Sequence, residues 1–186
     1  RGVIRMTKSS ENVRRMVLCA MFTALVAVCS QIAVPMPWGV PINLALFAVY
    51  MAGTMLGPVW GTASQVVFIA LAAIGVPVLA NFSGGFDKFV GPTGGFLISF
   101  PLMAYIIGLG VEHRDAFKGA FVTAVVVGTL VNYVVGVALF VVVAHSTIAV
   151  GISACVLPFI PTAIIKAVLA CAIGLNLRKR IPGLKA

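Results

Sequence analysis

The sequence has few charged residues and very few acidic ones. Only 9% of its 186 residues are charged, and only four residues are Asp or Glu, whereas soluble globular domains contain about 25% charged residues. Hydrophobic residues make up 61% of the chain. The composition therefore excludes an ordinary water-soluble domain and indicates an integral membrane protein.

The sequence also lacks the motifs that mark many enzymes and metal proteins. It has no GxxxxGK[ST] phosphate-binding loop, and its two histidines, His113 and His145, fall in loops on opposite sides of the membrane by the topology given below. Its four cysteines form no CxxC pair and lie in or beside apolar runs, so we expect them to be packing residues. They are Cys19, Cys29, Cys155 and Cys171. No catalytic residue and no metal site is predicted.

Long apolar runs are the dominant feature of the chain. We interpret six of them as transmembrane helices, because a helical span needs about 20 apolar residues and the strict alternation of outer-membrane barrels is absent. The runs cover residues 12–33, 42–56, 59–76, 94–111, 116–143 and 158–178. The predicted fold class is all-α, a polytopic six-helix bundle in a single domain over residues 1–186.

Two local features indicate how these runs connect. Gly57 and Pro58, within GPVWG, allow only a tight hairpin between the second and third runs. The opening residues are basic and then apolar, as in a signal peptide. The apolar run is long, however, so we expect a retained first helix.

Basic residues gather at the two ends of the chain. An even number of spans puts both termini on one side, and with the loop between the fourth and fifth runs that side holds eleven of the thirteen Lys and Arg residues. The opposite loops hold Lys88 alone. The positive-inside rule therefore predicts cytoplasmic termini in the cell membrane. It also accounts for the net charge of +9 without nucleic acid, since no basic face with interleaved aromatics is present.

The last apolar run lies within PFIPTAIIKAVLACAIGLNLRKR, and from Phe159 to Leu177 its single charge is Lys166. A lysine near the middle of a bilayer costs about 3 kcal/mol on insertion scales, so it indicates a functional site. The structural alternative is snorkelling of the side chain to the headgroups. At the rise of an α-helix, however, Lys166 lies about 10 Å inside the helix end, a depth that is marginal for snorkelling. By the predicted topology, a site around Lys166 opens to the outside.

Two outer loops differ from simple connectors. The first, VPMPWGVPIN, contains three prolines and Trp38, which stiffen its backbone. The second, NFSGGFDKFVGPTGGF, contains five glycines, which allow close approach to a ligand and hinge motion. We expect these loops to form a lid over an outward-facing pocket. The alternative is flexible turns with an interfacial aromatic belt.

Three segments carry a resemblance to a known family. VPINLALFAVYMAGTMLGPVWGTASQ, AAIGVPVLANFSGGFDKFVGPTGGFLISFP and LPFIPTAIIKA resemble successive signatures of the BioY family, the substrate-binding S-components of energy-coupling factor (ECF) biotin transporters. The resemblance covers most of the chain from Val40 to Lys166. It implies six helices, a buried vitamin site near the outer face, and energising partners.

The implied partners are a transmembrane coupling protein and two cytoplasmic ATPases. The chain itself would need no cofactor, and ATP would be used by the ATPases. S-components present small residues of the first helix to the coupling protein, and Ala20, Ala24 and Ala27 match that pattern. Small residues four apart allow two membrane helices to approach closely.

The resemblance also implies the site residues, with informative departures. The expected substrate-binding residues are Lys166, Asn81, Phe82, Gly84, Gly85, Lys88, Asn43 and Ala163. The family usually has glutamine, tyrosine and aspartate where this chain has Ala45, Phe68 and Ala163. Leaving the N–H donors of a biotin ureido ring unpaired would cost about 1–3 kcal/mol each, unless Asn43, Asn81 or Gln65 supplies an acceptor.

Several functions remain open on the sequence alone. The ligand is biotin in a rearranged site, or lipoate or another biotin-like acid with a less polar head. A stand-alone facilitator would need polar residues along a whole pore, whereas the polar groups here concentrate in the outer halves of the spans. An intramembrane enzyme would need a nucleophile and base or a metal cluster, which the sequence does not offer.

Overall fold

The computed structural model describes residues 8–37, 40–114 and 119–180, so Trp38 lies outside the described residues. The helices are α1 (Lys8–Gln31), α2 (Ala45–Ala73), α3 (Gly94–Ile98), α4 (Phe100–Glu112), α5 (Ala120–Val143), α6 (Ile148–Cys155) and α7 (Ile160–Arg180). Two 3-10 turns, η1 (Ala80–Phe82) and η2 (Phe86–Phe89), lie between α2 and α3. Strands β1 (Ala33–Val34) and β2 (Ile42–Asn43) form a short antiparallel ribbon. The helical fold class is confirmed.

Five helices in the described part of the chain are long and apolar enough to cross a membrane. They cover Glu11–Gln31, Ala45–Ala73, Gly94–Glu112, Ala120–Val143 and Ile160–Arg178. The second of these, α2, contains two of the six predicted runs. Counting its two arms separately gives six apolar segments, in agreement with the sequence.

The two arms of α2 are joined by the predicted hairpin at Gly57. Gly57 has a φ of 76° and a ψ of −172°, outside the helical region, and Pro58 follows it. A Cβ atom added to Gly61 would lie 3.0 Å from the carbonyl oxygen of Ala52. In an unbroken helix these residues would be about 13 Å apart along the axis. The chain therefore reverses at Gly57, where glycine adopts a positive φ without steric cost.

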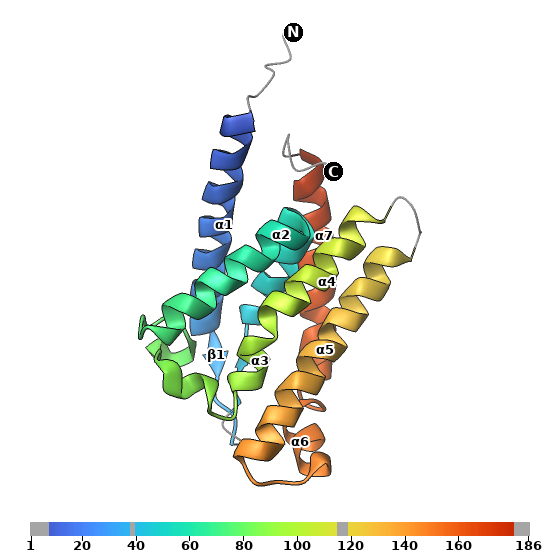
Figure 1. Cartoon of the computed structure of the whole chain (residues 1–186). Helices are drawn as coiled ribbons and strands as arrows, with labels where there is room; N and C mark the ends of the chain where they lie inside the picture. Colours follow the sequence, from blue (N-terminus) through green and yellow to red (C-terminus); the bar gives the residue numbers. More distant parts are fainter. Residues whose placement is uncertain (1–7, 38–39, 115–118, 181–186) are drawn as a thin grey trace.

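The bundle has two distinct ends (Figure 1). The start of α1, the end of α4, the start of α5 and the end of α7 lie at one end, which we call the terminal end. The ribbon, residues 74–93 and α6 lie at the other, which we call the loop end. The start of α1 and the end of α7 therefore lie at the same end of the bundle, as an even number of apolar segments requires.

Two local elements were not predicted from the sequence. The connector between α5 and α7 was expected to be a loop but contains α6, which begins after Thr147, whose side-chain oxygen accepts a hydrogen bond from the Val150 N–H. The apolar run of α6 is too short to span a membrane. It instead buries Ala154 and Cys155 beside Phe140. The proline-rich loop forms the ribbon, with Ala33 opposite Asn43.

Apolar side chains fill the interior between the two ends. Val49, Tyr50, Met103 and Ile107 are fully buried where α2 and α4 pack together. In the second arm of α2, Phe68 stacks on Phe100 with ring centroids 6.5 Å apart. This packing separates the polar groups of the loop end from those of the terminal end.

Arg178 closes the terminal end of this core. Its guanidinium is buried and donates hydrogen bonds to the main-chain carbonyls of Thr54 (3.0 Å) and Met55 (3.2 Å). These carbonyls belong to the last turn of the first α2 arm, where a helix offers no further N–H donors to its carbonyl groups. A basic side chain at this position satisfies them and complements the helix dipole.

Arg178→Met is expected to destabilise the fold, because it leaves two buried carbonyls without a donor. Hydrogen bonds to charged groups contribute about 1.5–3 kcal/mol, and the free energy of unfolding should fall by a similar amount. Thermal unfolding in one detergent measures the effect, with Arg180→Met, an exposed neighbour, as the matched control. Equal melting temperatures for Arg178→Met and the unmodified protein would contradict this role.

Candidate binding site

A cavity of about 230 Å³ lies at the loop end of the bundle. Its walls come from nearly every element that reaches this end. They are formed by Ser30, Val40, Pro41, Asn43, Leu46, Leu79, Ala80, Asn81, Ser83, Lys88, Thr93, Phe96, Leu97, Phe100, Asn132, Tyr133, Phe159 and Lys166. Four of the eight predicted site residues, Asn43, Asn81, Lys88 and Lys166, are among them. The other four, Phe82, Gly84, Gly85 and Ala163, are not.

Lys166 is buried, with 7% of its surface exposed. Its Nζ donates a hydrogen bond of 2.6 Å to the main-chain carbonyl of Asn43. Among the described residues it has no ion pair with a carboxylate. An ammonium can donate three hydrogen bonds, so two N–H groups of this buried cation remain for a ligand in the cavity. Its position in the first turns of α7 places the charge beside the ribbon, as the sequence predicted for a site near one membrane face.

Asn43 meets the cavity at the start of α2. Its Oδ1 accepts a hydrogen bond from the Ala45 N–H at 3.1 Å, while its main-chain carbonyl accepts from Lys166. Both acceptors of Asn43 therefore have a partner within the protein. Its contribution to a ligand would be its side-chain amide donors.

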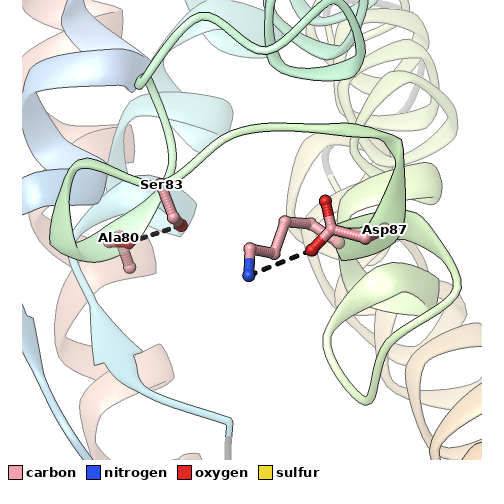
Figure 2. Close-up of polar contacts among 4 residues, drawn as sticks. Ala80, Ser83 and Asp87 are labelled. Atoms are coloured by element: carbon pink, nitrogen blue, oxygen red, sulfur yellow. Dashed lines mark hydrogen bonds and ion pairs between the residues drawn. The ribbon is translucent and has the colours of Figure 1, made fainter.

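The turn from Leu79 to Ser83, which we call the lid turn, forms one wall of the cavity. Leu79 donates its N–H to the Ser83 carbonyl at 2.9 Å, and the Ser83 hydroxyl donates to the Ala80 carbonyl at 2.7 Å (Figure 2). Asn81 has a left-handed backbone with a φ of 58° and lines the cavity. Phe82 also has a positive φ, of 52°, but its ring is 76% exposed and outside the cavity wall.

The predicted glycine pair shapes the lid without lining the cavity. Gly84 packs so closely against the Val76 carbonyl that no Cβ fits there. Gly85 has a φ of 109°, and its N–H donates to the Ala72 carbonyl at the end of α2 at 2.7 Å. Both positions therefore require glycine, Gly84 for close packing and Gly85 for its positive φ. Close approach to a ligand, which the glycine content suggested, stays a prediction.

Lys88 lines the cavity and is partly exposed, so it lies at the rim; its neighbour Asp87 is labelled in Figure 2. Its Nζ lies 3.2 Å from Asp87 Oδ2, and both side chains are substantially exposed. Exposed ion pairs contribute about 0–1 kcal/mol. The ammonium can therefore leave Asp87 for a ligand carboxylate at little cost.

Ala163 lies outside this cavity. It is buried among Tyr133, Phe140 and Cys155 and lines a separate apolar groove between α5 and α7. Residues three apart on a helix differ by about 60° around its axis. Here that difference points Lys166 and Ala163 into two different spaces.

The other positions that depart from the family pattern also lie outside the cavity wall. Ala45 and Phe68 are buried in the apolar core. Gln65 is fully buried, and its Nε2 donates to the Ser64 hydroxyl at 3.0 Å. Its Oε1 has no hydrogen-bond partner among the described residues, but Gln65 does not line the cavity.

Two cavity residues on α5 were missed from the sequence. Asn132 is buried, and its Nδ2 donates to the Phe96 carbonyl (3.1 Å) and the Ser99 hydroxyl (2.7 Å), while its Oδ1 has no partner in the described part of the chain. The neighbouring Tyr133 hydroxyl is likewise buried without a described partner. The sequence did contain a signal for Asn132. A carboxamide inside an apolar span is costly to bury, as is the charge of Lys166, and therefore indicates a functional site.

The described residues contain no group of three or more His, Cys, Asp or Glu side chains that could hold a metal ion. Burial raises the pKa of the Cys155 thiol in α6 to about 11, so this thiol is protonated and unreactive near neutral pH. The chemistry of the cavity is therefore hydrogen bonding and charge pairing.

Comparison with known proteins agrees with this architecture. The BioY transporters of Thermotoga maritima and Lactococcus lactis subsp. cremoris, both named biotin transporters, are 37% and 30% identical to the chain. The first alignment covers 89% of this chain and 96% of that protein, and the second covers 92% and 94%. A crystal structure of the S-component for biotin from an ECF-type ABC transporter matches with a TM-score of 0.83 and 32% identity, over 94% of this chain and 95% of that one.

These relatives are named as transporters, which confirms the prediction of a transport protein rather than an enzyme. The model of the BioY family matches residues 6–183, nearly the whole chain. The chain therefore belongs to the BioY family.

Proposed function

We propose that this chain is the substrate-binding S-component of an ECF-type importer and that it binds biotin in the cavity at the loop end. The observation that carries this proposal is the buried Lys166 ammonium, which faces an otherwise largely apolar cavity with two N–H groups unused. A ligand with an apolar body, a carboxylate and a few further polar atoms fits such a wall. Biotin has these features, and the relatives named above are biotin transporters.

The carboxylate and the ureido N–H groups of biotin have partners among the cavity residues. The carboxylate pairs with Lys166, an attraction of roughly 4 kcal/mol at 4 Å and an effective dielectric near 20, before desolvation. The ureido N–H donors find acceptors in Asn132 Oδ1 and the Tyr133 hydroxyl, which are buried without described partners. These two groups take the place of the acceptors that the family usually has at Ala45, Phe68 and Ala163. Their presence favours biotin over lipoate, which has no ureido group to pair with them.

The proposed orientation places the cavity on the outer side of the membrane. At the terminal end, the described residues include Arg14, Arg15, Arg114, Arg178 and Arg180, and Arg1, Arg5, Lys118 and Lys185 lie outside the described residues. The loop end has Lys88 and Lys166. The positive-inside rule then assigns the terminal end to the cytoplasm, so that both termini are cytoplasmic and the cavity faces outward.

Transport would require a coupling protein and two ATPases. The ATPases, and not this chain, would use ATP. The face of α1 predicted for the coupling protein is available in this fold, because Ala20 and Ala24 are exposed and Ala27 is half-buried. A stand-alone facilitator is less compatible with the apolar core of Val49, Tyr50 and Met103 between the two ends. Co-purification with the partners separates these two functions.

Lys166→Met is expected to weaken biotin binding by at least a hundredfold, because it removes the buried partner of the carboxylate. The uncharged amide of biotin should bind poorly to the unmodified protein and should lose little more on Lys166→Met. Calorimetry with both ligands measures this, with Lys88→Met as the matched control. If Lys88→Met, and not Lys166→Met, abolishes the preference for the acid, the carboxylate lies at the rim and the proposed role of Lys166 is wrong.

Replacing Ala20 and Ala24 by tryptophan is expected to prevent assembly with the coupling protein, because the added bulk separates helices that must pack closely. Biotin binding to the isolated variant should stay within about threefold of the unmodified protein, since neither alanine lines the cavity. Co-purification from cells that contain the coupling protein and ATPases measures assembly. Tryptophan at Val122 and Val126, exposed on α5, provides the control, and normal assembly of the α1 variant would count against this interface.

A further inference from the structure

Gln31, the last residue of α1, makes hydrogen bonds across to the lid turn. Its Nε2 donates to the Leu79 carbonyl at 2.9 Å and, at a longer 3.4 Å, to the Pro77 carbonyl. Its Oε1 accepts from the Phe82 N–H at 2.9 Å. One side-chain amide therefore bonds both the entry and the exit of the turn, about 50 residues further along the chain.

The lid turn has an unfavourable backbone that needs such support. Asn81 and Phe82 are consecutive non-glycine residues with φ values of 58° and 52°. Asparagine tolerates left-handed backbone better than most residues, but at Phe82 this backbone costs about 1 kcal/mol or more and persists only where surrounding structure holds it. Without the Gln31 amide, the Phe82 N–H and the Leu79 carbonyl would have to find water, and the turn could relax to ordinary backbone angles.

The conformation held by Gln31 is the one that forms the cavity wall. Leu79, Ala80, Asn81 and Ser83 all line the cavity, whereas Gln31 itself does not. Any change of φ at Asn81 would rotate its side chain out of the wall. The position of this wall therefore depends on a residue that does not touch the ligand space.

We propose that Gln31 is a positioning residue that latches the lid turn to the end of α1 and so retains the ligand in the cavity. The identity of that ligand rests on the function proposed above, but the latch itself does not. Gln31 continues the helical spacing of Ala20, Ala24 and Ala27 along one side of α1. A partner that displaces this face of α1 would therefore pull on the latch and loosen the lid, which provides a route to ligand release.

Gln31→Met tests the latch without a ligand. Methionine keeps nearly the same length and apolar stem but has no amide, so it separates hydrogen bonding from packing. Hydrogen exchange of residues 77–83 in the ligand-free protein is expected to accelerate about tenfold or more, while exchange in α4 and α5 stays unchanged. Thr62→Val is the matched control, because it removes another side-chain hydrogen bond to a main-chain carbonyl, that of Pro101, away from the lid. Wild-type exchange in residues 77–83 of Gln31→Met would overturn the proposal.

The dissociation rate of biotin provides the second readout. Gln31→Met is expected to raise this rate about tenfold, equivalent to about 1.4 kcal/mol, with a smaller change in the association rate, whereas Thr62→Val leaves both unchanged. Equal dissociation rates for Gln31→Met and the unmodified protein would also overturn the latch. If the unmodified protein binds no biotin, the proposed function fails, and the ligand-free exchange measurement alone decides the role of Gln31.

Discussion

The hydrogen bond between Lys166 and the Asn43 carbonyl is the contact on which the site depends. A buried ammonium is costly in a membrane protein unless it has close partners. This contact supplies one partner and joins the start of α7, the ribbon and the start of α2 at a single point. It uses one donor of three, so the cation is held in place but not saturated. A site that must bind and later release an anion requires that incomplete pairing.

The same two helices meet again at the other end of the bundle. Arg178 lies twelve positions after Lys166 on α7, and its acceptors, Thr54 and Met55, lie eleven and twelve positions after Asn43. Twelve residues of helix span about 18 Å, so α7 and the first arm of α2 run parallel with basic contacts at both ends. These contacts hold the arm that ends at the Gly57 hairpin. They fix the position of the first α2 arm, which contributes to the cavity wall, relative to the apolar core.

The features predicted correctly from the sequence are those set by local chemistry. Gly57 and Pro58 determine the hairpin because glycine reaches a positive φ without steric cost and proline does not continue a helix. Lys166 is conspicuous because a charge in an apolar run has a high cost. Asn132 carried a similar but weaker signal and was overlooked. The segment of α6 is a short apolar run whose structure periodicity alone does not determine.

The features that sequence could not provide depend on contacts between distant residues. Gln31 is unremarkable in its own helix, and its role follows from a turn about 50 residues away. The glycine pair Gly84–Gly85 signalled special backbone, but not that it serves the lid's shape. Likewise, helical spacing put Ala163 near Lys166, whereas in the fold Lys166 lines the cavity and Ala163 lines the groove between α5 and α7.

The central claim is that the loop-end cavity holds biotin with its carboxylate on Lys166. A structure of the protein purified with biotin tests this most directly. The account predicts density for biotin inside the cavity, with a carboxylate oxygen within about 3 Å of Lys166 Nζ and the ureido ring beside Asn132 and Tyr133. Biotin bound outside this cavity, or bound within it with Lys166 still paired only to Asn43, would contradict it.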